Sequence, residues 1–263
     1  MIHPTALIDP AAKIDSSAFI GPYAVIDGPA EVGPGCRIEA HAQIVGHVVL
    51  GEATSIGRAA VIGGDPQDLS FDPAIQSSVI IGPRNVIREH VTIHRGSKPG
   101  SATLVGEGNF IMAGVHFAHD VVIGNKNIFA NAAMLAGHVH IGNHVFVGGG
   151  AGFHQFIRVG DYCLVQGNGS LGMDLPHYCA MHGTNQIVGL NIVGLRRQGF
   201  TAEQRAEIKE MFKLLFHSGK NHSQAVESAQ QREWEPAARR LLDFVMEPSK
   251  RGICPVRRGG TND

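Results

Sequence analysis

Residues 20–62 read IGPYAVIDGPAEVGPGCRIEAHAQIVGHVVLGEATSIGRAAVI, and every sixth residue of this stretch, counted from Ile20, is a large aliphatic one. The residue four places after each aliphatic is small or β-branched, as at Ala24 and Thr54. The same phase reaches back to the N-terminus. Its aliphatic positions are Ile2, Ile8, Ile14, Ile20, Ile26, Val32, Ile38, Ile44, Leu50, Ile56 and Ile62. The stretch therefore follows a strict six-residue repeat.

The repeat pauses after Ile62, resumes for residues 81–93, pauses again and runs from Val105 to Leu171. A period of six matches neither the 3.6 residues of a helical turn nor the alternation of a single strand. It fits short strands joined by tight corners, with glycine and aspartate where the backbone angles are unusual. Three hexapeptides close one coil, and coils stack about 4.8 Å apart. We therefore expect a β-solenoid, a triangular parallel β-helix over residues 1–190.

Two interruptions and a change of pattern divide the chain further. We expect loops to leave the solenoid at about residues 63–80 and 94–104, and long loops on a rigid scaffold commonly carry function. Residues 191–255 are expected to form a small α-helical domain, in which Thr201 and Gln204 form a capping box. Residues 256–263 are expected to be a disordered tail.

Composition limits the partners and the compartment. The formal net charge of the 263 residues is −1, which does not indicate nucleic acid or an anionic membrane as a partner. The cysteines are scattered without a CxxC pair. No apolar run approaches the roughly 20 residues that span a bilayer, and the N-terminal residues lack the features of a signal peptide. We expect a cytoplasmic protein without a transmembrane segment.

Histidines gather in the second half of the repeat, at intervals close to one coil of eighteen residues. The aligned residues, with one histidine three places earlier, are His116, His119, Gly137, His138, His154 and Gln155. A histidine can act as a general base near neutral pH, so we expect His119 to take a proton with Asp120 orienting its ring. The backbone N–H of Gly137 is a candidate donor to an oxyanion.

Several motifs are more specific than the repeat. They are Pro66-Gln-Asp-Leu69, Ile87-Arg-Glu89, Thr92-Ile-His-Arg-Gly96, His116-Phe-Ala-His-Asp120, Leu135-Ala-Gly-His-Val139, His154-Gln-Phe156, Asn191-Ile192, Gly194-Leu-Arg-Arg197 and Gly199-Phe200. On these motifs the chain resembles, over almost its whole length, the UDP-N-acetylglucosamine O-acyltransferases of lipid A biosynthesis. The resemblance implies a left-handed winding of the β-helix, a homotrimer with clefts between neighbouring prisms, and no metal or other cofactor. It also implies acyl carrier protein as the acyl donor and the 3-position of a UDP-amino sugar as the acceptor.

The resemblance also implies a role for individual residues. His119 would be the general base, supported by Asp120, and Gly137 would supply the oxyanion hole. Asp68 would contact the sugar, and Gly167 would lie where the acyl chain ends. Asn191 and Arg197 would hold the nucleotide. The remaining cleft residues would be His116, His138, His154 and Gln155.

Three departures from the family pattern fall near the nucleotide-sugar site. Ser70 stands where the family usually has lysine, Val193 where it has glutamate, and Gln198 where it has arginine. Each lost cation removes a charge-assisted hydrogen bond worth roughly 1.5–3 kcal/mol, a loss for which Lys98 or Arg95 could compensate. We therefore keep a second acceptor open, the 3-amino analogue of the sugar, which would give an amide.

Two further alternatives come from other classes of function. Three histidines can hold zinc between subunits, as in the γ-class carbonic anhydrases, and His116, His119 and His138 are the candidates for such a site. The chain could also be a catalytically silent trimeric scaffold, in which the histidines merely occupy polar corners. The intact His-x-x-His-Asp and Gly-His motifs favour catalysis over both.

Overall fold

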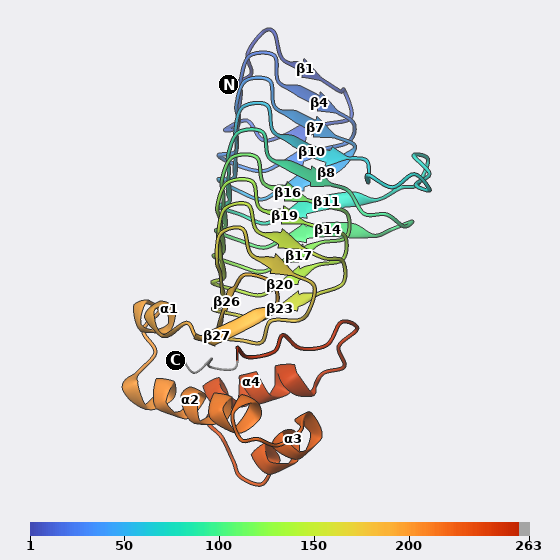
Figure 1. Ribbon diagram of the computed structural model, residues 1–263. Coiled ribbons are helices and arrows are strands. Elements are labelled where there is room, and N and C mark those ends of the chain that lie inside the picture. Colours follow the sequence, from blue (N-terminus) through green and yellow to red (C-terminus); the bar gives the residue numbers. More distant parts are fainter. Residues whose placement is uncertain (258–263) are drawn as a thin grey trace.

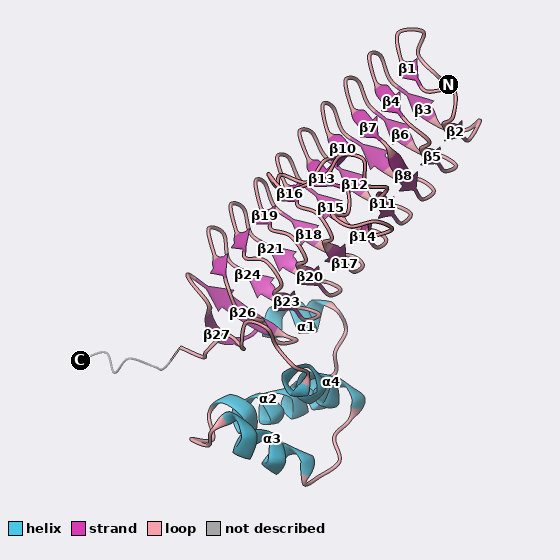
Figure 2. Ribbon diagram, turned by 90° about the vertical axis from the view of Figure 1, so that its right-hand side faces the viewer, coloured by secondary structure: helices cyan, strands magenta, loops and turns pink. Residues whose placement is uncertain are grey.

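The computed structural model describes residues 1–257 and shows a β-helix with three parallel faces, followed by a cluster of helices (Figure 1). Each coil gives one short strand to each of three sheets, and successive coils stack along the axis (Figure 2). Partners along a sheet are mostly eighteen residues apart, as for Val25 and Gln43. The chain thus forms the parallel β-helix of hexapeptide repeats that its period predicts, wound left-handed as the resemblance implies.

The three sheets share this plan from end to end. Sheet 1 contains β1 (Leu7–Ile8), β4 (Val25–Asp27), β7 (Gln43–Val45), β10 (Val61–Gly64), β13 (Thr92–His94), β16 (His116–Phe117), β19 (Met134–Leu135), β22 (Gly152–Phe153) and β25 (Ser170–Leu171). Sheet 2 contains β2 (Lys13–Ile14), β5 (Glu31–Val32), β8 (His47–Leu50), β11 (Ser78–Ile81), β14 (Ala102–Val105), β17 (Val122–Ile123), β20 (His140–Ile141) and β23 (Arg158–Val159). Sheet 3 contains β3 (Phe19–Ile20), β6 (Arg37–Ile38), β9 (Ser55–Ile56), β12 (Val86–Ile87), β15 (Phe110–Ile111), β18 (Ile128–Phe129), β21 (Phe146–Val147), β24 (Leu164–Val165), β26 (Cys179–His182) and the antiparallel β27 (Gln186–Leu190).

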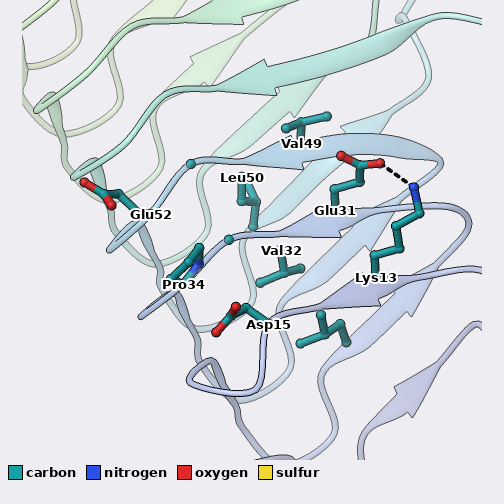
Figure 3. Close-up of a pocket in the computed structure, with 11 residues that line it drawn as sticks. Lys13, Asp15, Glu31, Val32, Pro34, Val49, Leu50 and Glu52 are labelled. Atoms are coloured by element: carbon teal, nitrogen blue, oxygen red, sulfur yellow. Dashed lines mark hydrogen bonds and ion pairs between the residues drawn. The ribbon is translucent and has the colours of Figure 1, made fainter.

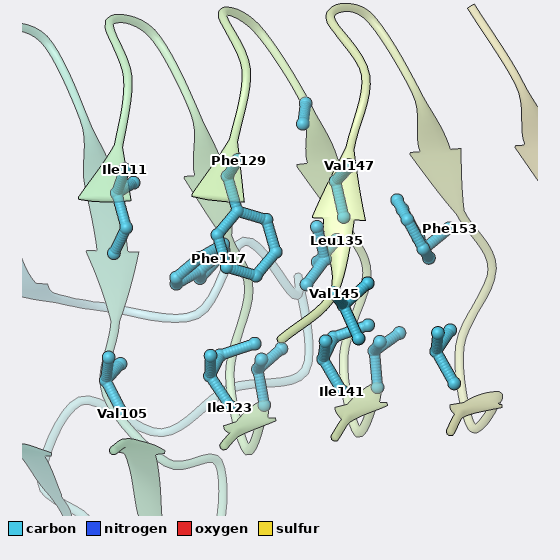
Figure 4. Packing of buried hydrophobic residues seen from close by; sticks show 14 of the residues in the cluster. Val105, Ile111, Phe117, Ile123, Phe129, Leu135, Ile141, Val145, Val147 and Phe153 are labelled. Atoms are coloured by element: carbon cyan, nitrogen blue, oxygen red, sulfur yellow. The ribbon is translucent and has the colours of Figure 1, made fainter. Parts of the chain in front are cut away.

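The interior is filled by the two residue classes of the repeat. Aliphatic positions such as Ile38 and Ile56 are fully buried, and so are the small positions such as Ala42 and Thr54. In the coils that carry the histidines, the larger side chains stack along the axis (Figure 4). Phe117 and Phe129 meet there edge to face with ring centroids 4.9 Å apart, a favoured aromatic geometry.

The corners demand left-handed backbone angles, which few residue types adopt readily. Gly114 and Gly150 have positive φ, yet many corners use larger residues instead. Asp120, His138 and Phe156 have φ of 57°, 59° and 67° and follow one another at eighteen-residue intervals. The same backbone angle recurs at many other corners, and in this column it fixes the direction in which the three side chains leave the prism.

Strands extend further into the two interruptions than the hexapeptide phase predicts. The first segment without strand is 65–77 rather than 63–80, because β10 and β11 are four residues long. The second is 95–101 rather than 94–104, because β13 continues to His94 and β14 begins at Ala102. Both segments project from the same side of the prism (Figure 1).

Arg95 fastens the first interruption to the second. Its guanidinium donates to Asp65 at 2.8 Å, to the carbonyl of Pro73 at 2.9 Å and to Ser77 at 3.1 Å. The side chain is only 12% exposed. Arg95 is therefore occupied by the loop itself, which leaves Lys98 as the cation of this loop that a substrate can use.

In the described residues, four helices follow the last strand: α1 (Ile192–Arg197), α2 (Ala202–Phe216), α3 (His222–Gln230) and α4 (Pro236–Met246). Thr201 and Gln204 form the capping box that the sequence predicts for α2. Tyr178 donates to the carbonyl of Ala237 at 2.9 Å, which ties α4 to the end of the prism. Within residues 1–257, no helix is both long and apolar enough to cross a membrane.

After α4 the chain returns to the prism as a strap, which we define as residues 247–257. Ile253 pairs with Asp174, and Val256 pairs with Ile187 of β27. The N–H of Arg257 donates to the carbonyl of Ile187 at 2.8 Å. The expected disordered tail is therefore wrong for residues 256 and 257, and its remainder, 258–263, lies outside the described residues.

Candidate active site

Three stacked turns between sheets 1 and 2 carry the histidine cluster. They are residues 118–120, 136–138 and 154–156, one above the other in successive coils. His138 N donates to the carbonyl of His119 at 3.1 Å, and Phe156 N donates to that of Gly137 at 3.2 Å. The eighteen-residue spacing thus brings the predicted side chains to one edge of the prism.

His119 and Asp120 form a half-buried pair. His119 Nδ1 lies 2.8 Å from Asp120 Oδ2, and the two side chains are 14% and 10% exposed. Burial opposes ionisation of Asp120, but hydrogen bonds from Ser97, His119 and Ser101 outweigh it, so the pKa of the carboxyl lies below its ordinary value. A carboxylate at Nδ1 fixes the tautomer and leaves Nε2 of His119 as the basic atom.

Ser97, which sequence reasoning missed, completes this pair. Its backbone N–H and its hydroxyl donate to Asp120 Oδ2 at 3.0 and 2.5 Å. The backbone N–H of Asp120 in turn donates to Thr103 at 2.9 Å. Ser97 lies in the loop 95–101, outside the repeat, so its distance from Asp120 along the chain gives no sign of the contact.

Gly137 lies directly against the base. A Cβ at this position would come within 2.5 Å of Cε1 and 2.6 Å of Nε2 of His119, so any other residue would displace the imidazole. In the described part of the chain, the N–H of Gly137 has no hydrogen-bond acceptor. This donor is therefore available beside Nε2, where an oxyanion hole is needed.

His116 and His138 flank the base on either side. The Nδ1 atom of His116 is 2.7 Å from the hydroxyl of Thr92, and burial lowers the pKa of His116. The ring of His138 meets that of His119 edge to face at 5.1 Å and stacks on Phe156 at 4.6 Å. Burial is also the largest cause of the lowered pKa of His138, so both flanking imidazoles favour the neutral form.

His94 is a second residue without a predicted role. It lies behind His116, with ring centroids 4.8 Å apart, and its Nδ1 is buried without a partner among the described residues. Burial, followed by the nearby histidines, lowers its pKa to about 4. A neutral His94 keeps a further positive charge away from His116.

A hollow of about 360 Å³ opens in front of the base. Its lining includes His116, His119, Gly137 and Gln155, together with Gln67 from the first loop. Gly152, which leaves its side-chain space empty, widens the hollow one coil along. The hollow thus presents a base, a free backbone donor and side-chain amides to one small volume.

Asp68 and His154 lie at the margin of this site. Asp68 is exposed, and its Oδ1 accepts hydrogen bonds from the N–H and hydroxyl of Ser70 at 2.9 and 2.8 Å, which lower the pKa of Asp68. His154 is also exposed and contacts the guanidinium of Arg251 from the strap. Arg251 Nε donates in addition to the carbonyl of Gln155 at 3.2 Å.

The structure places the remaining predicted residues elsewhere on the prism. Asn191 and Arg197 line a second hollow of about 370 Å³ beside sheet 3, together with Val193 and Gln198. Asn191 caps α1 there by accepting from Gly194 N at 3.0 Å. Gly167 lies at a third edge, stacked on Gly149. One copy of the chain therefore does not bring these residues to His119.

The three histidines considered as an alternative zinc site do not lie together within one copy of the chain. Among residues 1–257, the group whose possible ligand atoms lie within 4.8 Å of one another is His119, Asp120 and His138, without His116. Its central atom, Asp120 Oδ2, already accepts both Ser97 hydrogen bonds and contacts His119. These contacts favour an orienting carboxylate over a metal ligand.

A larger hollow, about 600 Å³, lies over sheet 2 near the N-terminus (Figure 3). It is shallow, and an ion pair of 2.9 Å between Lys13 and Glu31 crosses it. Its lining holds no histidine and no cysteine. Size alone therefore does not identify the functional site of this molecule.

Comparison with known proteins identifies the family of the chain. The family model described as "Udp N-acetylglucosamine O-acyltransferase; Domain 2" matches residues 174–254, and the model of bacterial transferase hexapeptides matches residues 11–46 and 102–137. The acyl-[acyl-carrier-protein]–UDP-N-acetylglucosamine O-acyltransferase of Burkholderia lata is 39% identical over 96% of this chain and 98% of its own length. The enzyme of the same name from Campylobacter concisus is 36% identical, with 98% of each chain covered.

Solved structures give the same result. The UDP-N-acetylglucosamine O-acyltransferase of Moraxella catarrhalis superposes with a TM-score of 0.90 at 38% identity, covering 96% of this chain and 99% of that one. The acyltransferase of Francisella novicida gives 0.92 at 35% identity, covering 98% and 94%. The chain is therefore an acyltransferase and belongs to the UDP-N-acetylglucosamine O-acyltransferase family.

Proposed function

We propose that this chain transfers an acyl group, 3-hydroxylated or not, from the thioester of acyl carrier protein to the 3-hydroxyl of UDP-N-acetylglucosamine, the first step of lipid A biosynthesis. The observation that carries the proposal is the arrangement of His119 Nε2 beside the free N–H of Gly137 at the wall of one hollow. The names of the similar enzymes supply the substrates.

The chemistry follows from the atoms at this corner. Nε2 of His119 removes the proton of the sugar hydroxyl as its oxygen attacks the thioester carbonyl carbon. The carbonyl oxygen becomes an oxyanion and accepts a hydrogen bond from Gly137 N–H. The C–S bond then breaks, and the leaving thiolate of acyl carrier protein takes this proton from the His119 imidazolium. Asp120 stays ionised throughout and stabilises the imidazolium while it exists.

We also propose that the working molecule is a homotrimer. Asn191 and Arg197 lie beside sheet 3, away from His119 of the same copy, so a neighbouring copy must bring them to the base if both hold one substrate. Apolar side chains face outward along sheet 3, among them Ile128 and Phe146 at 38% and 41% exposure. Leu69, at the tip of the first loop, is fully exposed, and patches of this kind mark interfaces.

The donor would approach from the helical end of the molecule. An apolar groove lies there between β27 and α2, and its rim carries the cations Arg205, Lys209 and Lys213. Acyl carrier protein is small and acidic, so these cations would raise its rate of encounter with the cleft. The pantetheine arm of acyl carrier protein, which carries the acyl group, would then extend along the prism to His119.

A second acceptor, the 3-amino analogue, is favoured by the same departures that the sequence shows. Val193 and Gln198 line the hollow of Asn191 and Arg197, and neither offers a charge to a nucleotide. Ser70 folds back on Asp68 instead of extending toward the hollow. The base and the oxyanion donor would serve an amine nucleophile equally well, with an amide as product.

The test is incubation of the purified protein with 3-hydroxyacyl carrier proteins of several chain lengths and each acceptor, followed by mass spectrometry. We expect an acylated sugar nucleotide from the wild-type protein and a decrease in kcat of about 10²–10⁴-fold for His119→Ala. The relative rates on the two acceptors decide between ester and amide formation. Equal rates for wild type and His119→Ala would contradict the assignment of the base.

A further inference from the structure

A further hollow, distinct from those described above, lies between the corner that carries His119 and the strap. Its volume is about 420 Å³, and it is lined by Lys98, His138, His140, Phe156, Arg158, Pro248 and Lys250. It shares His138 with the histidine cluster and opens on the opposite side of the corner from the hollow in front of His119. Segments distant in sequence, the loop 95–101 and the strap, meet at this position.

Cations predominate in this lining. Lys98 and Lys250 are both exposed at the mouth, and neither forms an ion pair with a carboxylate of residues 1–257. The ammonium of Lys250 lies 4.7 Å from the centre of the Phe156 ring, which holds it over the hollow. Arg251, next along the strap, contacts the ring of His154 and donates to the carbonyl of Gln155, and it forms no ion pair with a carboxylate of residues 1–257.

The carboxylates near the hollow are already engaged. Arg158 pairs with Asp174 at 2.9 Å and with Glu247. Asp120, on the side of the catalytic corner, accepts from Ser97 and lies 3.8 Å from His138. Burial is the largest cause of the lowered pKa of His138, and the positive charges of Lys98 and Lys250 lower it further. Because His138 lines the hollow, the electrostatic field of both lysines acts inside it. An anion that enters the hollow would meet two ammonium groups that form no ion pair with a carboxylate of residues 1–257.

We propose that this hollow binds a phosphoryl group of a substrate. The inference rests on the proposed function, because both substrates carry such a group: the acceptor a diphosphate, and the donor the phosphate of its pantetheine arm. The site adjoins the base, since the His138 ring that lines it touches His119. Lys98 and Lys250 would then supply the positive charge that the chain lacks at Ser70 and Gln198, where the family usually has lysine and arginine.

The direct test is calorimetric titration of the full-length protein with pyrophosphate, UDP and pantetheine 4′-phosphate. The variant is Lys98→Gln/Lys250→Gln, and the matched control is Lys13→Gln/Lys220→Gln, which removes the same net charge far from the hollow. We expect the variant to bind pyrophosphate at least about tenfold more weakly than wild type, with the difference decreasing at high salt. The control should bind within about twofold of wild type, since remote charges are screened.

The other two ligands identify the source of the phosphoryl group. A loss of affinity for UDP alone assigns the hollow to the acceptor, and a loss for pantetheine 4′-phosphate alone assigns it to the donor. Unchanged affinity of the variant for all three ligands would overturn the proposal, as would an absence of pyrophosphate binding by wild type. If wild type binds pyrophosphate through these lysines but transfers no acyl group, the proposed function fails and the anion site stands.

Discussion

At the scale of single residues, one corner of the prism carries the proposed chemistry. Asp120 adopts a left-handed backbone angle, which turns its carboxylate toward the ring of the preceding residue, His119. Gly137, one coil later, has no Cβ and so lets the imidazole lie against the backbone. The base, its orienting carboxylate and the oxyanion donor thus come from two successive coils, and no flexible segment is needed to assemble them.

Ser97 is expected to act as a positioning residue for this corner. Loss of its hydroxyl in Ser97→Ala leaves Asp120 freer to rotate, so we expect kcat to fall by about tenfold while KM changes little. Ser97→Thr, which keeps the hydroxyl, should restore most of the rate. Steady-state kinetics of the three proteins is the measurement. A rise in KM with kcat unchanged would instead place Ser97 on the substrate.

The sequence predicts the corner residues but not their supports. The eighteen-residue interval predicts that the turn of His119 and Asp120 stacks on the turn of Gly137, because residues one coil apart in the sequence lie above one another in the prism. Ser97 and Arg251 come from the loop and the strap, where no repeat operates. Their contacts depend on how these segments fold back, and a pattern of residue types does not contain that information.

At the scale of elements, a ladder of buried asparagines supports the corners between sheets 2 and 3. The side-chain oxygen of Asn85 accepts from the N–H of Asn109 at 2.9 Å, and that of Asn109 accepts from the N–H of Asn127 at 2.9 Å. Asn127 continues the ladder to Val145 N at 2.7 Å. Each amide thus satisfies a backbone donor that the corner leaves without a strand partner.

Replacement of one rung should destabilise the prism. Asn109→Ala leaves the buried N–H of Asn127 and the carbonyl of Gly124 without partners, and each such loss costs about 1–3 kcal/mol. Asn131→Ala, at an exposed corner, should change the free energy of unfolding by less than about 0.5 kcal/mol. Denaturant unfolding at one protein concentration compares the two. Equal decreases in the free energy of unfolding for Asn109→Ala and Asn131→Ala would show that the asparagine ladder does not stabilise the prism.

The hexapeptide phase predicts the strands well because each strand buries one aliphatic side chain. It fails at the interruptions, where β10, β11 and β14 run to four residues. There backbone pairing, such as that of β11 with β14 over all four residues, lengthens the strands beyond the two residues that the repeat predicts. The helix α1 lies inside the expected helical domain of residues 191–255, but its six residues are too few to show a helical period of their own.

At the scale of the whole molecule, the residues proposed to bind the substrates are divided between two faces. His119 lies at the edge between sheets 1 and 2, and Arg197 lies beside sheet 3. A closed ring of three copies can bring one face of each prism to another face of its neighbour. The sequence of one chain cannot reveal this geometry, because surface residues that meet across copies share no interval.

The central claim is that His119 of one copy and Arg197 of its neighbour act in one site. The measurement is the acyltransferase activity of trimers that contain both His119→Ala and Arg197→Ala subunits, co-expressed with two different tags and purified through both. Trimers of either variant alone should have little activity. Every mixed trimer contains one junction at which both intact residues meet, so we predict about one third of the wild-type rate per trimer. A mixed-trimer activity no higher than that of the two single variants would contradict the account.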